Sequence, residues 1–425
     1  MNTLLSLPND LLRIIVSFLS VSSKFSLLLV SKSFVFVVDE LIIKNSCKIV
    51  PDAIAYPDLF KWLVPDPTNL SKRRTKQICS EAVSTGSLEI VKYMPKKVWR
   101  RRDYDTIYNE AVKIGNFEII KYIHKMYCPW NESTSEIAAE NGHFKIIKWL
   151  YRNRCPFNNL AFDNAAKNGH LEMLQWMHRN RCPRGLYACE NAGSKDHLEV
   201  LRWLSENGYC PDQRTCIAAA SNGHLNILRW LLDNDCPSNA SACTYAAQNG
   251  HFDVLIWLHE NGCPWNEHAC SGAASNGHFG ILRYLHENGC PWNVTTMYHA
   301  VRKNHFEILQ YLHENGCPWH EGICTVAVSQ GHFEILKYLH ENGCPWHELT
   351  CASAANNGHF EILKYLHENG CPWDGNASLY ATQVGHLRIL QYLYHNGCAW
   401  DDTIIRNTAM TNKRHKILKW LDQKI

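Results

Sequence analysis

The sequence predicts an all-α fold, an α-solenoid of about 13 helix-turn-helix repeats that follows a small helical segment of different character. Three observations support this prediction. A short motif recurs every 27 residues, each unit reads as two amphipathic helices, and the first 45 residues lie outside the repeat. The chain has 425 residues and is 46% hydrophobic, which is enough to bury such a core.

The repeat is measured by a recurring histidine, most often within Asn-Gly-His. These histidines stand 27 residues apart, at positions 143, 170, 197, 224, 251, 278, 305, 332, 359 and 386. The register continues upstream with wider spacing at Gly115 and Gly86, and downstream it reaches His415. A fixed period of this length is typical of solenoids, in which stacked units bury a shared core. We therefore expect the array to span residues 75–425.

One unit, residues 265–291, shows the logic of each element. Residues 268–276 form a predicted first helix with small side chains on one face, and residues 279–288 form a second with an apolar stripe. Gly277 separates them, since only glycine enters the left-handed region without penalty. Pro291 prevents the second helix from continuing. Neither helix can bury its stripe alone, so neighbouring units must stack.

The predicted domains are a helical segment at residues 1–45, a linker with a degenerate capping repeat at 46–74, and the array at 75–425. Residues 57–63 read as a lone second helix that caps the start of the array. The last unit has the polar outer face expected of a C-terminal cap. Its basic residues are Lys413, Arg414, Lys416, Lys419 and Lys424.

The repeat resembles the ankyrin-repeat family, as in residues 273–282 (AASNGHFGIL) and 354–364 (AANNGHFEILK). Two departures matter. The period is 27 residues rather than about 33, and the family's Thr-Pro-Leu-His tetrad is absent, with Cys270 in the place of its Leu. We expect the projecting hairpins to be reduced to the short Cys-Pro-Trp turn. Such repeats are similar to those of large DNA viruses of protists, which would place a viral chain in the host cell.

The positions that vary between repeats lie on the first helix, whereas the second-helix tails repeat His-Glu-Asn-Gly almost unchanged. Two varying positions stand three residues apart and share a helix face. The resemblance implies that first helices line a concave groove, so we expect this stripe to bind a protein target. The alternative is that these are solvated positions that vary freely. The candidate target-binding residues are Glu140, Lys167, Gln248, Arg302, Asn356 and Gln383, with Ile137, Tyr245, His299 and Tyr380.

Residues 1–45 form predicted short amphipathic helices with more apolar surface than they can hide. The segment resembles the F-box family, on its Leu-Pro pair and on the run of residues 30–34 (VSKSF). The resemblance implies that apolar anchors dock into a groove of a Skp-type adaptor of a cullin–RING ubiquitin ligase. The alternative is that the segment only caps the solenoid. The candidate adaptor-binding residues are Leu7, Pro8, Leu11, Leu12, Ile15, Phe18, Leu19, Leu28, Val30 and Phe34.

The cysteines and histidines are expected to be structural. Eleven of the 19 cysteines stand at second-helix exits, from Cys128 to Cys398, seven stand in first helices, and Cys47 lies outside the array. The closely spaced ligand pairs that zinc favours are lacking, and no distinctive Cys–His pair suggests a nucleophile, so we expect no metal, no cofactor and no enzyme. The histidine should bond backbone at the interhelical loop. The tryptophans expected to pack between units are Trp130, Trp265, Trp292, Trp319, Trp346, Trp373 and Trp400.

Composition narrows the function further. A net charge of +3 argues against nucleic-acid wrapping. Neither a secretory signal nor a membrane span is recognised, so a cytoplasmic protein is expected, with the nucleus as the alternative location. The basic run at residues 96–102 is either a solvated insertion loop or a nuclear signal or anion contact. The function predicted is a substrate-recognition subunit of an SCF-type ligase. The alternative is an ankyrin scaffold or competitive binder of a host protein without ubiquitylation.

Overall fold

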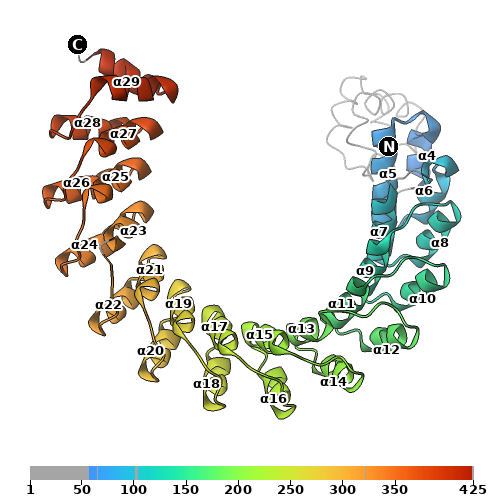
Figure 1. Ribbon diagram of the computed structural model, residues 1–425. Helices are drawn as coiled ribbons and strands as arrows, with labels where there is room; N and C mark the ends of the chain where they lie inside the picture. Colours follow the sequence, from blue (N-terminus) through green and yellow to red (C-terminus); the bar gives the residue numbers. More distant parts are fainter. Residues whose placement is uncertain (1–56, 65, 101–103, 321, 424–425) are drawn as a thin grey trace, which may run out of the picture. The chain divides into compact units, whose positions relative to one another are not determined.

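The computed structural model describes residues 57–64, 66–100, 104–320 and 322–423 (Figure 1), and this part of the chain is helical without strands. The candidate adaptor-binding residues, Leu7 to Phe34, lie outside the described residues, as does Cys47. The chain divides into two compact units, unit 1 ending at Cys210 and unit 2 beginning at Pro211. The all-α prediction is confirmed for the described ranges.

Unit 1 begins with a lone helix and continues as helix pairs. Its helices are α4 (Pro57–Leu63), α5 (Lys72–Ser84), α6 (Leu88–Tyr93), α7 (Asp105–Ile114), α8 (Phe117–Lys125), α9 (Glu132–Glu140), α10 (Phe144–Arg152), α11 (Asn159–Lys167), α12 (Leu171–Arg179), α13 (Ala188–Gly193) and α14 (Leu198–Glu206), with 3₁₀ turns η1 (Pro67–Asn69) and η2 (Lys96–Val98). From α5 onward, odd numbers are first helices and even numbers second helices. Helix α4 packs against α6, as a second helix would.

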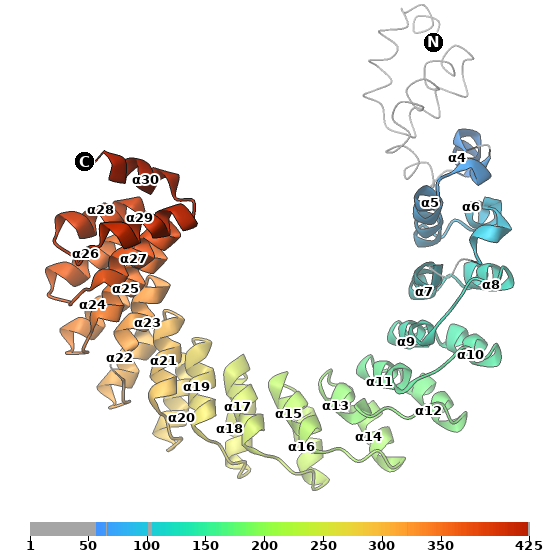
Figure 2. The same cartoon turned by 45° about the horizontal axis from the view of Figure 1, so that its top comes forward.

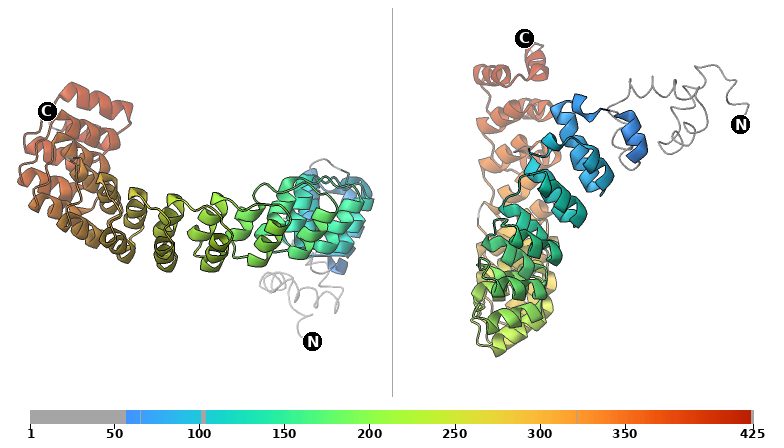
Figure 3. Two further views of the ribbon diagram at one scale, coloured as in Figure 1. Left: turned by 60° about the horizontal axis from the view of Figure 1, so that its bottom comes forward. Right: turned by 90° about the vertical axis from the view of Figure 1, so that its right-hand side faces the viewer.

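Unit 2 consists of helix pairs throughout, and its orange and red helices stack in chain order in both views of Figure 3. Its helices are α15 (Gln213–Ser221), α16 (Leu225–Asp233), α17 (Ala240–Asn249), α18 (Phe252–Glu260), α19 (Glu267–Ser275), α20 (Phe279–Glu287), α21 (Val294–Arg302), α22 (Phe306–Glu314), α23 (Ile323–Gln330), α24 (Phe333–Glu341), α25 (Glu348–Asn357), α26 (Phe360–Glu368), α27 (Gly375–Val384), α28 (Leu387–His395), α29 (Asp402–Thr411) and α30 (His415–Asp422). The described ranges of the two units together hold thirteen pairs, as predicted.

The core explains the two-row arrangement visible in Figure 2. First helices bury small side chains: Cys270, Ala273 and Ala274 of α19 are fully buried. Second helices bury larger ones, such as Leu282 and Leu285 of α20. Because small side chains let backbones approach, first helices of neighbouring repeats make more extensive contacts than second helices do. Within each unit, the first helices therefore form the tightly packed row.

Positive-φ residues end the helices as the sequence predicts, but glycine is not always used. Gly277 (φ +77°) follows the first helix α19, and Gly289 (φ +77°) follows the second helix α20. Equivalent places are taken by Asn304 (φ 60°) after a first helix and by Arg154 (φ 61°) after a second. The turn geometry is thus conserved within the chain even where its preferred residue is missing.

Several repeats depart from the regular pattern. Tyr209 occupies the place of the exit-turn cysteine, its carbonyl accepting from the Cys189 thiol at 3.2 Å, and this leaves Cys210 exposed. In the last repeat the histidine's place is taken by Arg414 and not by His415, because α30 begins 28 rather than 27 residues after α28, although α29 begins in register. The basic run is anchored rather than fully solvated, since Val98 and Trp99 are buried while Lys96 and Lys97 are exposed.

The helices described here are short. Within the described ranges, none is long and apolar enough to cross a membrane.

Candidate protein-binding surface

The predicted target-binding stripe lies on accessible faces of the first helices. The stripe has two rows, and the leading row is the one nearer the C-terminal end of each first helix. All six candidates of the leading row are exposed: Glu140, Lys167, Gln248, Arg302, Asn356 and Gln383. Of the residues three positions earlier, Tyr245 is 42% exposed, and Ile137, His299 and Tyr380 are half-buried. The stripe runs along α9 and α11 in unit 1, and along α17, α21, α25 and α27 in unit 2. Its role in target binding stays a prediction.

The residue type at the leading position can vary because the contact that this residue makes with the next repeat is formed by its backbone carbonyl. The Nε2 atom of His278 lies 3.1 Å from the carbonyl oxygen of Gln248, in the preceding repeat. The same contact joins His332 to Arg302 at 3.1 Å and His170 to Glu140 at 3.3 Å. A carbonyl is common to every residue type, so the side chain at this position is left unconstrained. The stripe is therefore free to specialise without loss of stacking.

This contact also refines the role predicted for the histidine. It does bond to backbone, but the acceptor belongs to the preceding repeat rather than to the histidine's own interhelical loop. Arg414 makes the equivalent bond, its Nε donating to the carbonyl of Gln383 at 3.0 Å. The histidine ring also packs over the glycine that follows the first helix of the preceding repeat. At Gly277, for example, an added Cβ would stand 2.8 Å from the ring of His305. The histidine and this glycine of the preceding repeat thus form part of one junction between repeats.

The second row of the stripe is less free. In unit 1, Asn164 and Asn191 occupy this row and donate to backbone carbonyls of the preceding first helix, each at 3.4 Å. In unit 2, His299 contacts the Tyr298 ring, and burial lowers the pKa of His299 with a further contribution from Arg302 and Lys303. Some members of this row are structural, so the leading row is the better candidate for recognition.

In unit 2, charged side chains are more frequent on the second helices than in the leading row of the first-helix stripe. The described second helices carry ion pairs such as Lys337–Glu334 at 3.0 Å and Arg388–Glu361 at 3.3 Å. The leading stripe carries Gln248, Asn356 and Gln383, with Arg302 as its charged member. Protein interfaces are depleted of charge at their centres and enriched in aromatic residues and arginine. The composition of the stripe is consistent with such an interface.

The second-helix row is stiffened by aromatic clusters between repeats. The ring of His286 stacks on Trp292 with centroids 3.8 Å apart, and its Nδ1 lies 2.8 Å from the hydroxyl of Tyr311 in the next repeat. Phe279 contacts the same tyrosine edge-to-face at 5.3 Å. Equivalent His–Trp stacks recur at His259, His313, His340 and His367. The prediction that the tryptophans pack between units is confirmed for these repeats.

Most of the described thiols are poorly suited to chemistry; Cys263 and Cys344 differ, because hydrogen bonds from the thiols of Cys243 and Cys324 lower their pKa. Burial raises the pKa of Cys155 and Cys216 to about 12 and that of Cys236 to about 11. Thiolate formation is therefore disfavoured, which is the behaviour of structural cysteines. Among the described residues, no group of three or more Cys, His, Asp or Glu side chains is placed to hold a metal ion. The exception to the burial pattern is Cys210, as noted above.

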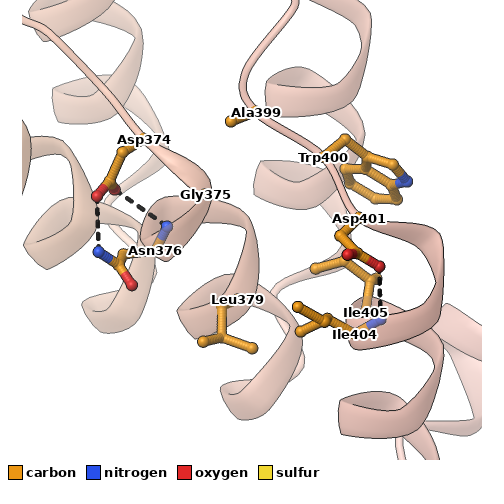
Figure 4. Close-up of a pocket in the computed structure, with 9 residues that line it drawn as sticks. All are labelled: Asp374, Gly375, Asn376, Leu379, Ala399, Trp400, Asp401, Ile404 and Ile405. Atoms are coloured by element: carbon orange, nitrogen blue, oxygen red, sulfur yellow. Dashed lines mark hydrogen bonds between the residues drawn. The ribbon is translucent and has the colours of Figure 1, made fainter.

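A pocket that the sequence interpretation missed lies between α27 and α29 (Figure 4). It has a volume of about 380 Å³. Figure 4 shows Asp374 and Asp401 on opposite sides, above Leu379 and Ile404. The signals that could have revealed it are two departures from the repeat pattern, Gly375 and Ala399, since residues at these places are otherwise larger.

Comparisons with known proteins agree with this architecture. A family model of ankyrin repeats (three copies) matches residues 186–269, 243–322, 270–350 and 324–404, and a second ankyrin model (many copies) matches 136–178. An F-box domain model matches residues 4–46, which confirms the F-box predicted there. Among solved structures, the human ASB11 ankyrin repeat domain is 19% identical, with a TM-score of 0.31, over 36% of this chain and 83% of that chain. No curated protein matches.

Proposed function

Because this chain belongs to the ankyrin-repeat family and an F-box model matches residues 4–46, we propose that it is a substrate-recognition subunit of an SCF-type cullin–RING ubiquitin ligase. The F-box would dock on a Skp-type adaptor, and the first-helix stripe would hold a protein target. The observation that carries the proposal is the presence of both modules in one chain. Both families typically serve protein interaction, so the chain itself is proposed to have no catalytic activity.

The adaptor half is tested with the full chain in a pull-down of a Skp-type adaptor. Leu7→Asp with Leu11→Asp places two charges where apolar anchors are proposed, so binding should be lost. Ser22→Asp with Ser23→Asp adds the same charge within the same segment and serves as the matched control. Retained binding in the leucine variant, or no binding by the unaltered chain, would rule out the ligase role.

The target half is tested by affinity purification with mass spectrometry. Changing Tyr245, Gln248, Arg302 and Gln383 to alanine removes side chains of the stripe and preserves the backbone contacts of the repeats. Captured targets should be lost, while the adaptor should still co-purify. A control set of second-helix residues, Glu314, Glu341, Lys364 and Arg388, changed to alanine should lose neither. Equal loss in both sets would indicate that the stripe is merely a solvated face.

A second candidate function follows from the stripe alone. An exposed first-helix surface could bind a host protein as a scaffold or competitor, whether or not the F-box engages a ligase. The similarity of the 27-residue units to repeats of viruses of protists favours this version if the chain is viral, and it would then act in the host cytoplasm or nucleus. Co-purification of a target without ubiquitin-ligase subunits would favour this function over the ligase role.

A further inference from the structure

The pocket between α27 and α29 exists because two small residues replace larger ones. Gly375 stands where equivalent first helices begin with Glu348, Val294 or Glu267. Ala399 stands where the exit turns of the preceding repeats in unit 2 carry proline, as at Pro372. A Cβ on Gly375 would lie in ordinary contact with Ala399, 3.8 Å from its carbonyl oxygen and 3.9 Å from its Cβ. The space is thus specific to this junction and not a feature of the repeat.

The floor of the pocket is apolar and partly open to solvent. Leu379, Ile404 and Ile405 line it, together with Trp400. Ile404 is 51% exposed and lies at the edge of the pocket, where a bound ligand would cover it. The apolar part of the pocket therefore fits an aliphatic chain or the face of a planar group.

The rim of the pocket is acidic. Asp374 and Asp401 line it, while most first-helix caps in unit 2 are uncharged, as at Asn266 and Asn293. Asp402 lies beside them, accepting from Trp400 Nε1 at 2.6 Å. Within the described ranges, no Lys, Arg or His nitrogen lies within 4.0 Å of an oxygen of these three carboxylates, the distance that defines a salt bridge. By contrast, the carboxylate of the cap Asp212 pairs with Arg214 at 2.9 Å.

We propose that this pocket binds an arginine side chain of the target protein. The inference rests on the proposed function, since it names one group that the target would present. The aliphatic shaft of arginine would cover Leu379 and Ile404. Its guanidinium would lie against Trp400 and donate to Asp374 and Asp401. Asp374 already accepts from the backbone and side-chain nitrogens of Asn376, and Asp401 from the backbone nitrogen of Ile404, but each carboxylate oxygen has a second acceptor position.

Two considerations favour arginine over other ligands. The N-termini of α27 and α29 contribute about half a positive charge each, which offsets only part of the charge of three carboxylates, so the pocket stays negative. An anion would be repelled, and an uncharged apolar residue would leave the carboxylates without an ion-pair partner. The planar guanidinium pairs with carboxylates and stacks on aromatic rings, whereas the lysine ammonium acts as a compact point charge.

The test uses the full chain with ¹³C-labelled isoleucine δ1 methyl groups, observed by NMR. The probe is the peptide acetyl-Gly-Arg-Gly-amide, and its neutral counterpart carries citrulline in place of arginine. The methyl signals of Ile404 and Ile405 should shift and saturate with the arginine peptide. The citrulline peptide should bind at least about tenfold more weakly, a difference of roughly 1.4 kcal/mol.

Variants taken from the chain's own repeats limit the risk of misfolding. Asp374→Asn with Asp401→Asn should keep both caps, since Asn266 caps its helix as Asp374 does and Asn116 as Asp401 does, and should weaken binding of the arginine peptide about tenfold. Gly375→Val with Ala399→Pro restores residue types found at Val294 and Pro372 and should abolish the shifts. Gly280→Val is the matched control, because a Cβ there meets no atom within 4 Å and lies in another repeat.

Absence of shifts in the unaltered chain, equal binding of the two peptides, or shifts that survive pocket closure would each overturn the inference. Target capture is measured separately, so the two failures can be distinguished. Capture that persists while the arginine peptide fails to bind would leave the proposed function standing without this pocket. Binding of the arginine peptide without capture of any target would contradict the proposed function but would still show that the pocket binds arginine.

Discussion

At the scale of single residues, the repeats separate what must be constant from what can change. The Gln248 side chain is exposed, while its carbonyl oxygen accepts the contact from His278. A residue in the left-handed region has a different constraint, since its backbone conformation favours glycine whatever the side chain contacts.

Arg154→Gly is expected to stabilise the protein by roughly 0.5–1 kcal/mol, because a residue with a Cβ is strained in the left-handed region. Arg154 has φ 61°, and the equivalent turn in α20 uses Gly289. The midpoint of chemical denaturation should rise, and Arg181→Gly should behave alike. Gly277→Ala provides the opposite case, as its Cβ would also meet the His305 ring at 2.8 Å. An unchanged or lower midpoint for Arg154→Gly would contradict the strain argument.

Cys210 should be the fastest thiol to react among those in the described ranges. It is exposed, while the other described cysteines are buried. A brief pulse of N-ethylmaleimide followed by peptide mass spectrometry should label Cys210 first, and Cys210→Ser should remove that label. The measurement is made in a Cys47→Ser background, since Cys47 lies outside the described residues. Labelling of the buried Cys236 at the same rate would show that its turn opens readily, because burial raises its pKa to about 11.

At the scale of elements, the junction between second helices is a repeated aromatic cluster. A histidine stacks on a tryptophan and a tyrosine of the next repeat lies against the histidine; in most of these clusters in unit 2 it also contacts the tryptophan, as at His286, Trp292 and Tyr311. Burial raises the pKa of Tyr311, as it does at the equivalent Tyr338. The hydroxyl therefore remains protonated and able to donate to the histidine.

Tyr311→Phe should lower the free energy of unfolding by about 1 kcal/mol, the usual net value of one hydrogen bond. The lost contact is the 2.8 Å bond between its hydroxyl and His286 Nδ1. Tyr365→Phe is the matched control, since Tyr365 contacts His340 through its ring and makes no such bond to it in the described structure. Thermal unfolding of both variants should show the larger decrease for Tyr311→Phe. Equal effects would attribute the stabilisation to ring packing alone.

Much of the fold could be predicted because the period and the helix ends are local signals. Gly277 and the stripe of α20 mark their elements without reference to distant residues. The exceptions arise from shifts of a single residue. Arg414 replaces the histidine because α30 starts one residue late, and Tyr209 displaces Cys210 from the buried place. The pocket was missed because it depends on side chains that are absent, at Gly375 and Ala399, rather than on a motif that is present.

At the scale of the molecule, each repeat within a unit is supported mainly by its two neighbours, so stability should decrease toward a free end. In unit 2 the terminal pair, α29 and α30, has a neighbour on one side within the described chain. Amide hydrogen exchange should therefore be faster in α30 than in α20 or α22, which are flanked on both sides. Measurement by mass spectrometry at the peptide level is sufficient, and equal protection would indicate that unit 2 opens only as a whole.

The histidine-to-carbonyl junction has an evolutionary consequence. From α17 to α24 of unit 2, one repeat joins the next through the same contact, and that contact does not depend on the identity of the exposed residue beside it. Loss or duplication of one 27-residue unit by unequal recombination would create a junction that the protein already contains. A gene of this kind can thus lengthen, shorten or reorder the proposed target-binding stripe in one event, and each product is expected to fold.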